Sequence, residues 1–150
     1  MASEMSTAGI KVYYSVAAAQ PALNAITTEI PDITSLPAMD SAPEGLECTP
    51  LSSTVWKKYV DGLKDPGNDF AMVANDTAAF RTAWSTLKTA YETDKATKIA
   101  WFKIDIPNRD KFVFSGIPGD LGFNGAEVNS VAQLTGHITP NTVVGWVATA

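Results

Sequence analysis

The chain has 150 residues, 45% of them hydrophobic, which is enough to bury the core of one domain without a disulfide or a metal. Its formal net charge of −5 is uneven, because residues 1–56 hold six acidic residues and one basic residue, whereas residues 57–150 hold ten of each sign. Lys and Arg do not cluster, which argues against a protein that binds nucleic-acid phosphates, and the acidic first third is typical of a solvated surface.

The N-terminal third predicts strands that prolines interrupt. Residues 10–16 form the first expected strand. Prolines then recur at intervals of six to ten residues from Pro21 to Pro50, and because proline lacks the backbone donor, strand pairing there is confined to sheet edges. We therefore expect short strands at 26–30 and 46–51 and a loop over 32–45. Residues 55–59 are consistent with either a strand or a helical turn, and residues 70–74 predict a strand.

One amphipathic helix follows. Its cap is expected at Asp76 or Asn75, either of which can accept a hydrogen bond from a backbone N–H of the first turn. Apolar residues recur at helical spacing, while polar residues occupy the opposite side. The four large side chains on the apolar stripe are the expected core of the helix: Phe80, Trp84, Leu87 and Tyr91.

A β-hairpin is predicted next, with strands at 98–106 and 111–117 and a turn at Pro107 and Asn108. In the first strand, Ala100, Phe102, Ile104 and Ile106 share the expected core face. Trp101 lies on the other face and is a candidate for exposure. Residues 116–125 then carry Gly at every third position, which lacks the pattern of a phosphate-binding loop and indicates a kinked connection.

The C-terminal segment predicts the longest strand, over residues 128–139, with an apolar face made of Val128, Ala132, Leu134 and Ile138. Residues 142–150 are too apolar for a chain terminus that packs against nothing. This tail is expected to dock either on its own domain or on a neighbouring molecule. The whole chain is predicted to be one mainly β domain, a β-sandwich or barrel flanked by a single helix, with an acidic, proline-rich segment at about 30–50.

No catalytic constellation is recognisable. His137 is the only histidine and falls in a predicted strand, which favours a polar-face or interface role over catalysis. Cys48 has no second thiol or nearby histidine with which to bind a metal. We expect no enzyme, no cofactor and no metal site. Neither a leader nor a stretch of roughly 18 apolar residues is present, so a soluble, unprocessed chain without a membrane partner is expected.

The order of features resembles that of the tail tube proteins of long, non-contractile-tailed bacteriophages. The likeness covers about residues 8–142 and is strongest over 30–67. It rests on the first strand, the lone helix, the hairpin, the Gly-rich bend, the closing Gly136-His-Ile-Thr139, and three runs in the first half: Ile30-Pro-Asp-Ile-Thr-Ser-Leu-Pro37, Pro43-Glu-Gly-Leu-Glu-Cys-Thr49 and Lys58-Tyr-Val-Asp-Gly-Leu-Lys-Asp-Pro-Gly67.

This resemblance implies a virion protein that assembles into six-membered rings through a shared inner barrel. The rings would stack into a hollow tube, built in the host cytoplasm around a tape-measure protein between a tip complex and a terminator. DNA would pass through the lumen without specific binding. Loops that reach neighbouring rings would correspond to residues 32–50 and 62–75. The candidate contact residues are Asp32, Asp40, Glu44, Glu47, Lys57, Lys58, Lys64, Asp65, Asp69 and Trp146.

Two other classes remain open. A carbohydrate- or protein-binding β-sandwich would use an exposed Trp101 or Trp146. A barrel with an apolar cavity would bind a small molecule, although the proline-rich first third is a poor match for it. A hydrolase has the least support, because the lone histidine and the scattered acids form no constellation.

Overall fold

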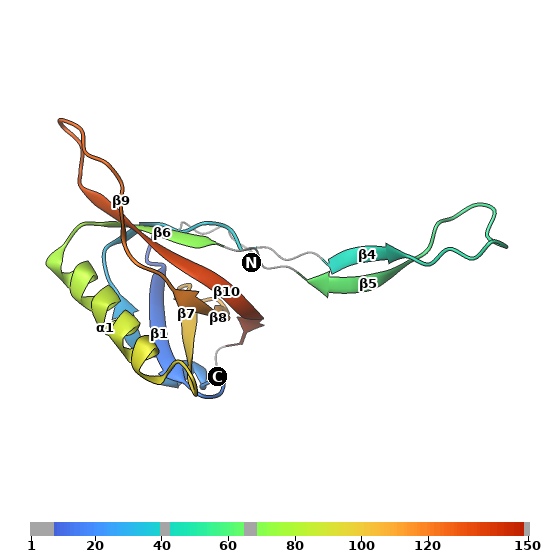
Figure 1. The fold of residues 1–150 in the computed structure, drawn as a ribbon, viewed down its shortest axis with the longest axis horizontal. Helices are drawn as coiled ribbons and strands as arrows, with labels where there is room; N and C mark the ends of the chain where they lie inside the picture. Colours follow the sequence, from blue (N-terminus) through green and yellow to red (C-terminus); the bar gives the residue numbers. More distant parts are fainter. Residues whose placement is uncertain (1–7, 40–42, 65–68, 149–150) are drawn as a thin grey trace.

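Eight strands form one antiparallel sheet that curls around a single helix (Figure 1). The computed structural model describes residues 8–39, 43–64 and 69–148, without the side chains of residues 43, 44, 62 and 64. The strand order is β2-β1-β7-β8-β10-β6-β3, with β9 paired to β10. The predicted fold class, mainly β with one flanking helix, is confirmed. No helix in the described residues is long and apolar enough to cross a bilayer.

The elements follow one another as β1 (Lys11–Ala17), a 3-10 turn η1 (Leu23–Ala25), β2 (Thr28–Ile30), β3 (Ile33–Ser35), β4 (Pro43–Glu47), β5 (Tyr59–Lys64), β6 (Phe70–Asn75), α1 (Ala78–Asp94), β7 (Ile99–Asp105), β8 (Lys111–Pro118), β9 (Gly122–Phe123) and β10 (Gln133–Val147). The segment expected to be a loop over 32–45 thus contains β3 and the start of β4. Residues 55–58 are neither strand nor helix.

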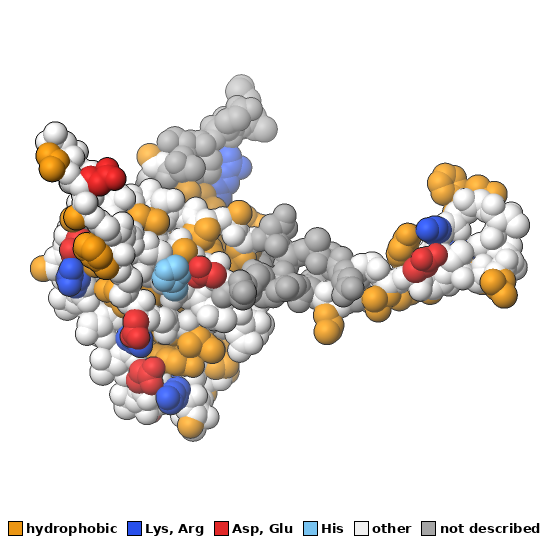
Figure 2. All heavy atoms as spheres, turned by 45° about the horizontal axis from the view of Figure 1, so that its top comes forward, with side chains coloured by type: hydrophobic (Ala, Val, Ile, Leu, Met, Phe, Trp, Pro, Cys, Tyr) orange, Lys and Arg blue, Asp and Glu red, His pale blue; other side chains and the backbone are white. Residues whose placement is uncertain are grey.

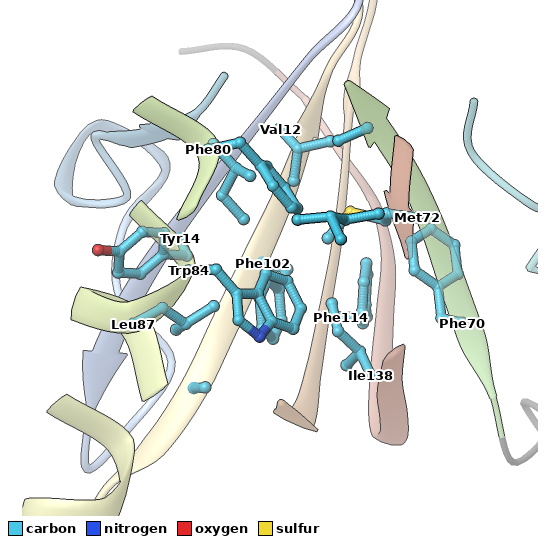
Figure 3. Close-up of a cluster of buried hydrophobic side chains, with 14 residues drawn as sticks. Val12, Tyr14, Phe70, Met72, Phe80, Trp84, Leu87, Phe102, Phe114 and Ile138 are labelled. Carbon is cyan, nitrogen blue, oxygen red and sulfur yellow. The ribbon is translucent and has the colours of Figure 1, made fainter. Parts of the chain in front are cut away.

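The helix packs its apolar stripe onto the concave face of the sheet (Figure 3). Phe80, Trp84 and Leu87 are fully buried there, as predicted, while Tyr91 is half-buried at the edge of the same cluster. Aromatic rings of the sheet complete the core, with the Phe114 ring centroid 5.0 Å from that of Phe70 and 5.3 Å from that of Phe102. These contacts make α1 part of the central core.

The predicted helix cap is wrong by one or two residues. Thr77 caps α1, because its Oγ1 accepts a hydrogen bond from the Phe80 backbone N–H at 3.1 Å. The Thr77 hydroxyl also donates to Asp32 Oδ2 at 2.6 Å, which ties the helix start to the β2–β3 turn. Asp76, the expected cap, instead accepts two hydrogen bonds from Arg81, at 2.5 and 2.8 Å. Tertiary contacts therefore decide which of three adjacent polar residues caps the helix.

Thr77→Ala is expected to lower the free energy of unfolding by about 1 kcal/mol, because one N–H of the first helical turn loses its acceptor. Thr77→Ser keeps the hydroxyl oxygen and serves as the matched control, with stability close to that of the unchanged chain. Urea denaturation of both variants gives the comparison. Equal losses in the two variants would show that the methyl group, and not the cap, carries the effect.

Asp76 and Arg81 predict a pH-dependent contribution to stability. The hydrogen bonds from the Arg81 guanidinium hold the pKa of the Asp76 carboxyl below its ordinary value. A carboxyl whose pKa is lower in the folded state stabilises the fold above its unfolded-state pKa, and this stabilisation is lost as the pH falls through its folded-state pKa. Asp76→Asn should therefore lower stability at neutral pH, and the deficit should shrink below about pH 4.

Arg81→Gln removes the same hydrogen bonds from the other side and should give the same pH profile. Urea denaturation of both variants and the unchanged chain, at neutral and acidic pH, makes the measurement. A deficit that is independent of pH would contradict this assignment.

The convex face of the sheet carries a second, smaller cluster. Trp101 is buried there with Ile26 and Val113, and its indole N–H donates to the Ala17 carbonyl at 3.3 Å. Trp101 thus lies on the face opposite the core, as predicted, but the expectation that it is exposed is wrong. The segment around η1 folds over this face, where Lys103 Nζ donates to the Leu23 carbonyl at 3.0 Å. Burial lowers the pKa of Lys103.

Strand β10 is longer than predicted and differently placed. It begins at Gln133, not at residue 128, and runs through the expected C-terminal tail to Val147. Its first half pairs with β6 and its second half with β8, with register shifts between Pro140 and Thr142 and between Val143 and Gly145. These irregularities disrupt the apolar alternation, which explains why the sequence indicates two segments. Of the two docking alternatives for the tail, residues 142–147 dock on their own domain.

Candidate assembly surface

The most conspicuous surface feature is a two-stranded arm made of β4, β5 and the loop that joins them. It is inserted between β3 and β6 and extends away from the body (Figure 1). Glu47 pairs with Tyr59, and Leu46 with Val60, in antiparallel register. Beyond the strands, the Cys48 N–H donates to the Lys58 carbonyl at 2.9 Å and the Lys58 N–H donates to Thr49 Oγ1 at 2.8 Å. The arm is thus a β-hairpin whose two strands are joined by hydrogen bonds that continue into the loop.

The arm exposes large apolar side chains along its length (Figure 2). In β5, the neighbouring Tyr59 and Val60 fall on opposite faces and both are exposed, so neither face packs on the core there. An isolated two-stranded hairpin is marginally stable in water, and contiguous exposed apolar surface is typical of association sites. The exposed residues are Leu46, Leu51, Val55, Trp56, Tyr59, Val60 and Leu63.

A second projection, the β9 lobe, comprises residues 119–132 with β9 inside it (Figure 1). Phe123 and Val128 are 84% and 90% exposed, and Val131 is also exposed. The base of the lobe is fixed to the body, because Trp84 Nε1 donates to the Gly119 carbonyl at 2.9 Å and Lys88 forms an ion pair with Asp120. The Asn124 side chain is hydrogen-bonded to Thr135 Oγ1 at 2.8 Å.

The structure groups about half of the predicted contact residues on the arm. Lys57 and Lys58 are exposed in the loop at its far end, and Glu47 is exposed at the end of β4. Glu44 and Lys64 lie in β4 and β5, but their side chains are outside the described part. Asp40 and Asp65 lie outside the described residues altogether. The role of these seven residues in contacts between subunits stays a prediction.

The other three predicted residues lie on the body. Asp32 makes the intramolecular bond to Thr77 described above. Asp69, at the root of the arm, lies 2.9 Å from His137 Nδ1. Trp146 is 61% exposed, and its ring meets that of Phe112 edge-on at 5.3 Å. Trp146 also lines a groove of about 700 Å³ with the β7–β8 turn.

Sequence reasoning missed the apolar residues of both projections. The sequence places Leu51 in the strand predicted over 46–51 and Val128 and Val131 in the strand predicted over 128–139, with Val128 on its apolar face, so their exposure contradicts those predictions. Trp56 lies in a segment without clear periodicity, and a large apolar residue of this kind has no assigned place in a core. The predicted contact set was chosen by charge and consequently named only Trp146 among the exposed apolar residues.

The groove between α1 and the β9 lobe, about 550 Å³, is lined by the salt-bridged Lys88 and Asp120 and by the outer face of the helix. In the described part of the chain, no group of three or more His, Cys, Asp or Glu side chains is arranged to hold a metal ion. The features that this surface offers in quantity are exposed apolar side chains and paired charges, which suit association with other proteins.

Comparison with known proteins finds solved structures that are similar to this chain. No protein-family model matches the sequence, and no curated protein matches it either. A chain from the virion of a native gene transfer agent particle aligns over 97% of this chain and 100% of its own length, with a TM-score of 0.62 and 12% identity. A chain from the tube-terminating cap of the anti-feeding prophage aligns over 99% of this chain and 94% of its own length, with a TM-score of 0.65 and 13% identity.

The chain has a phage tail tube-like fold. A further match, from the sheath/tube terminator of an extracellular contractile injection system, has a TM-score of 0.62 and 12% identity and aligns over 98% of this chain and 99% of its own length. The resemblance to tail proteins is confirmed at the level of the fold. The narrower resemblance to long, non-contractile tails stays a prediction, because the matched particles include one described as contractile.

Proposed function

We propose that this chain is a non-enzymatic structural subunit of a phage-like tail, which associates with copies of itself into six-membered rings that stack into a tube. One observation carries the proposal. The tail tube-like fold extends over nearly the whole chain, and the largest departure from its globular body is an arm with exposed apolar side chains. Among the matched particles, one tail is described with C6 symmetry.

The proposal includes the partners that the sequence resemblance implies. Copies of the chain would enclose a tape-measure protein during assembly in the host cytoplasm, between a tip complex and a terminator. DNA would later pass through the lumen of the tail in the virion. The absence of clustered Lys and Arg in the sequence supports passage without specific binding, since phosphate affinity comes chiefly from such clusters.

A terminator ring is the second candidate. Two of the matched chains come from structures described as a tube-terminating cap and a sheath/tube terminator. A terminator would form single rings that end a tube, whereas a tube protein would form stacks. A carbohydrate-binding module is less well supported than either, because of the two tryptophans expected to serve it, Trp101 is buried and Trp146 is exposed.

Negative-stain electron microscopy of the purified chain over a range of concentrations tests the proposal. Stacked rings or hollow tubes are the expected result, and isolated rings at every concentration would favour the terminator. A chain that stays monomeric at the highest concentration would overturn both. Tail particles that contain this chain but no outer sheath would support the narrower assignment to a non-contractile tail.

A further inference from the structure

The far end of the arm and the β9 lobe are opposite in charge. Residues 48–58, at the far end of the arm, contain Lys57 and Lys58 and no acidic residue, whereas the arm as a whole has three residues of each sign. Residues 119–132, the β9 lobe, contain Asp120 and Glu127 and no basic residue, and because Asp120 is ion-paired with Lys88 of the body, Glu127 provides the acidic charge of the projecting part. We infer that the arm of one copy docks on the β9 lobe of a second copy of this chain. The inference rests on the proposed self-association and adds the surface that receives the arm.

The exposed apolar side chains support the same pairing. Of the twelve large apolar side chains exposed in the described part of the chain, ten lie on these two projections, seven on the arm and three on the lobe. Each projection places its apolar residues beside its charges, as with Trp56 next to Lys57 and Val128 next to Glu127. Apolar contacts between the two would be flanked by attractive charge pairs, which favours a defined register.

The contact has to form between copies. Figure 1 shows the arm and the β9 lobe leaving the body on widely separated sides, with the body between them. In Figure 2 the apolar side chains at the end of the arm again lie at the opposite extreme of the molecule from the lobe. An arm therefore cannot reach the lobe of its own chain without a large rearrangement.

Like-with-like pairing is disfavoured by the same charges. Two arm ends in contact would bring the lysines of both copies together, and two lobes would bring their acidic residues together. Juxtaposed like charges disfavour such contacts at an interface. A contact between two different surfaces is heterologous. Such a contact repeats from copy to copy and either closes into a ring or continues as a filament.

The remaining grooves fit the arm less well. The one lined by Ile10, Ile33 and Leu36 has a volume of about 280 Å³, and neither acidic nor basic residues line it. The groove beside Trp146 is lined by both Arg109 and Asp110, so its charges give an arm with two lysines no net attraction. In the described residues, the β9 lobe thus combines exposed apolar side chains with acidic residues whose charge is opposite to that of the far end of the arm.

Charge reversal on each projection tests the inference in a form that misfolding cannot imitate. One variant, Lys57→Glu with Lys58→Glu, makes the far end of the arm negative, like the lobe. The other, Ala126→Lys with Glu127→Lys, makes the lobe positive, like the far end of the arm, and all four side chains are exposed. Assembly of each full-length variant alone, and of an equimolar mixture, is measured by sedimentation and electron microscopy. Lys95→Glu with Lys98→Glu, at the end of α1, is the control for net charge.

Each variant alone should need at least about tenfold more protein to assemble, which corresponds to the loss of about 1.4 kcal/mol per contact. The mixture should regain assembly near the concentration of the unchanged chain, because each arm then meets a lobe of opposite sign, and the control pair should assemble normally. A mixture as defective as its components, beside an unchanged chain that assembles, would overturn the inference and leave the proposed function intact. An unchanged chain that never assembles would overturn both.

Discussion

Trp84→Ala is expected to lower the free energy of unfolding by about 3–5 kcal/mol, the typical cost of removing a large buried aromatic side chain. Trp84 is 2% exposed, its ring centroid lies 6.1 Å from that of Phe80, and its indole N–H bonds the Gly119 carbonyl. The ring also lies directly against β10, where a Cβ added at Gly136 would meet Trp84 Cζ3 at 2.7 Å. Losing the ring therefore leaves a cavity between α1 and the sheet.

Two comparisons make this prediction specific. Trp56→Ala changes the same residue type on the exposed arm and should alter monomer stability by no more than about 0.5 kcal/mol. Gly136→Ala forces a methyl group toward the indole ring and should cost roughly 1–3 kcal/mol by overpacking. Urea denaturation at concentrations too low for assembly gives all three values. Similar losses for Trp84→Ala and Trp56→Ala would contradict the placement of Trp84 at the centre of the core.

The helix and the β7–β8 hairpin could be predicted because their signals are local. A stripe of apolar residues at helical spacing marks α1, and turn-forming Pro107 and Asn108 separate two strands rich in β-branched and aromatic residues. Asn108 takes a φ of 59°, in the left-handed region that asparagine tolerates better than most residues. Each of these features is decided within a few residues of sequence.

The features that the sequence did not reveal depend on distant segments. Trp101 alternates correctly for the face opposite the core, and it is buried there because the η1 segment and the end of β10, both far away in the sequence, pack over that face. Thr77 caps α1 in preference to Asp76 and Asn75, and its hydroxyl also donates a hydrogen bond to Asp32, which lies 45 residues away in the sequence. The bulges of β10 disrupt the alternation that would have joined its two halves.

The arm escaped prediction for a different reason. Strand patterns are recognised by the alternation that one buried face imposes, and β5 has no buried face within its own chain. A hairpin that is completed by another molecule carries apolar residues on both faces. The apolar residues on both faces of such a hairpin can be explained only once the structure shows that the arm extends away from the body.

Replacing residues 43–64 with a short Gly-Ser linker is expected to abolish assembly while leaving the body folded. The β3–β6 pairing, with Ile33 opposite Ala74 and Ser35 opposite Val73, lies outside the replaced segment, and none of the described side chains of the arm belongs to either core cluster. We expect monomer stability to change by about 1 kcal/mol or less, since surface segments away from the core contribute little.

The expected effect on assembly is far larger. An interface that loses all seven exposed apolar side chains of the arm, Trp56 included, should weaken by well over 2.7 kcal/mol, or about a hundredfold in the assembly concentration. Trp56→Ala alone provides the intermediate case, because a central tryptophan typically contributes about 2 kcal/mol or more to an interface. Circular dichroism and sedimentation on the same samples separate folding from association. Tubes that form at the usual concentration without the arm would show that the subunits join through the body alone, whereas a graded loss from Trp56→Ala to the full replacement would identify the arm as the principal contact.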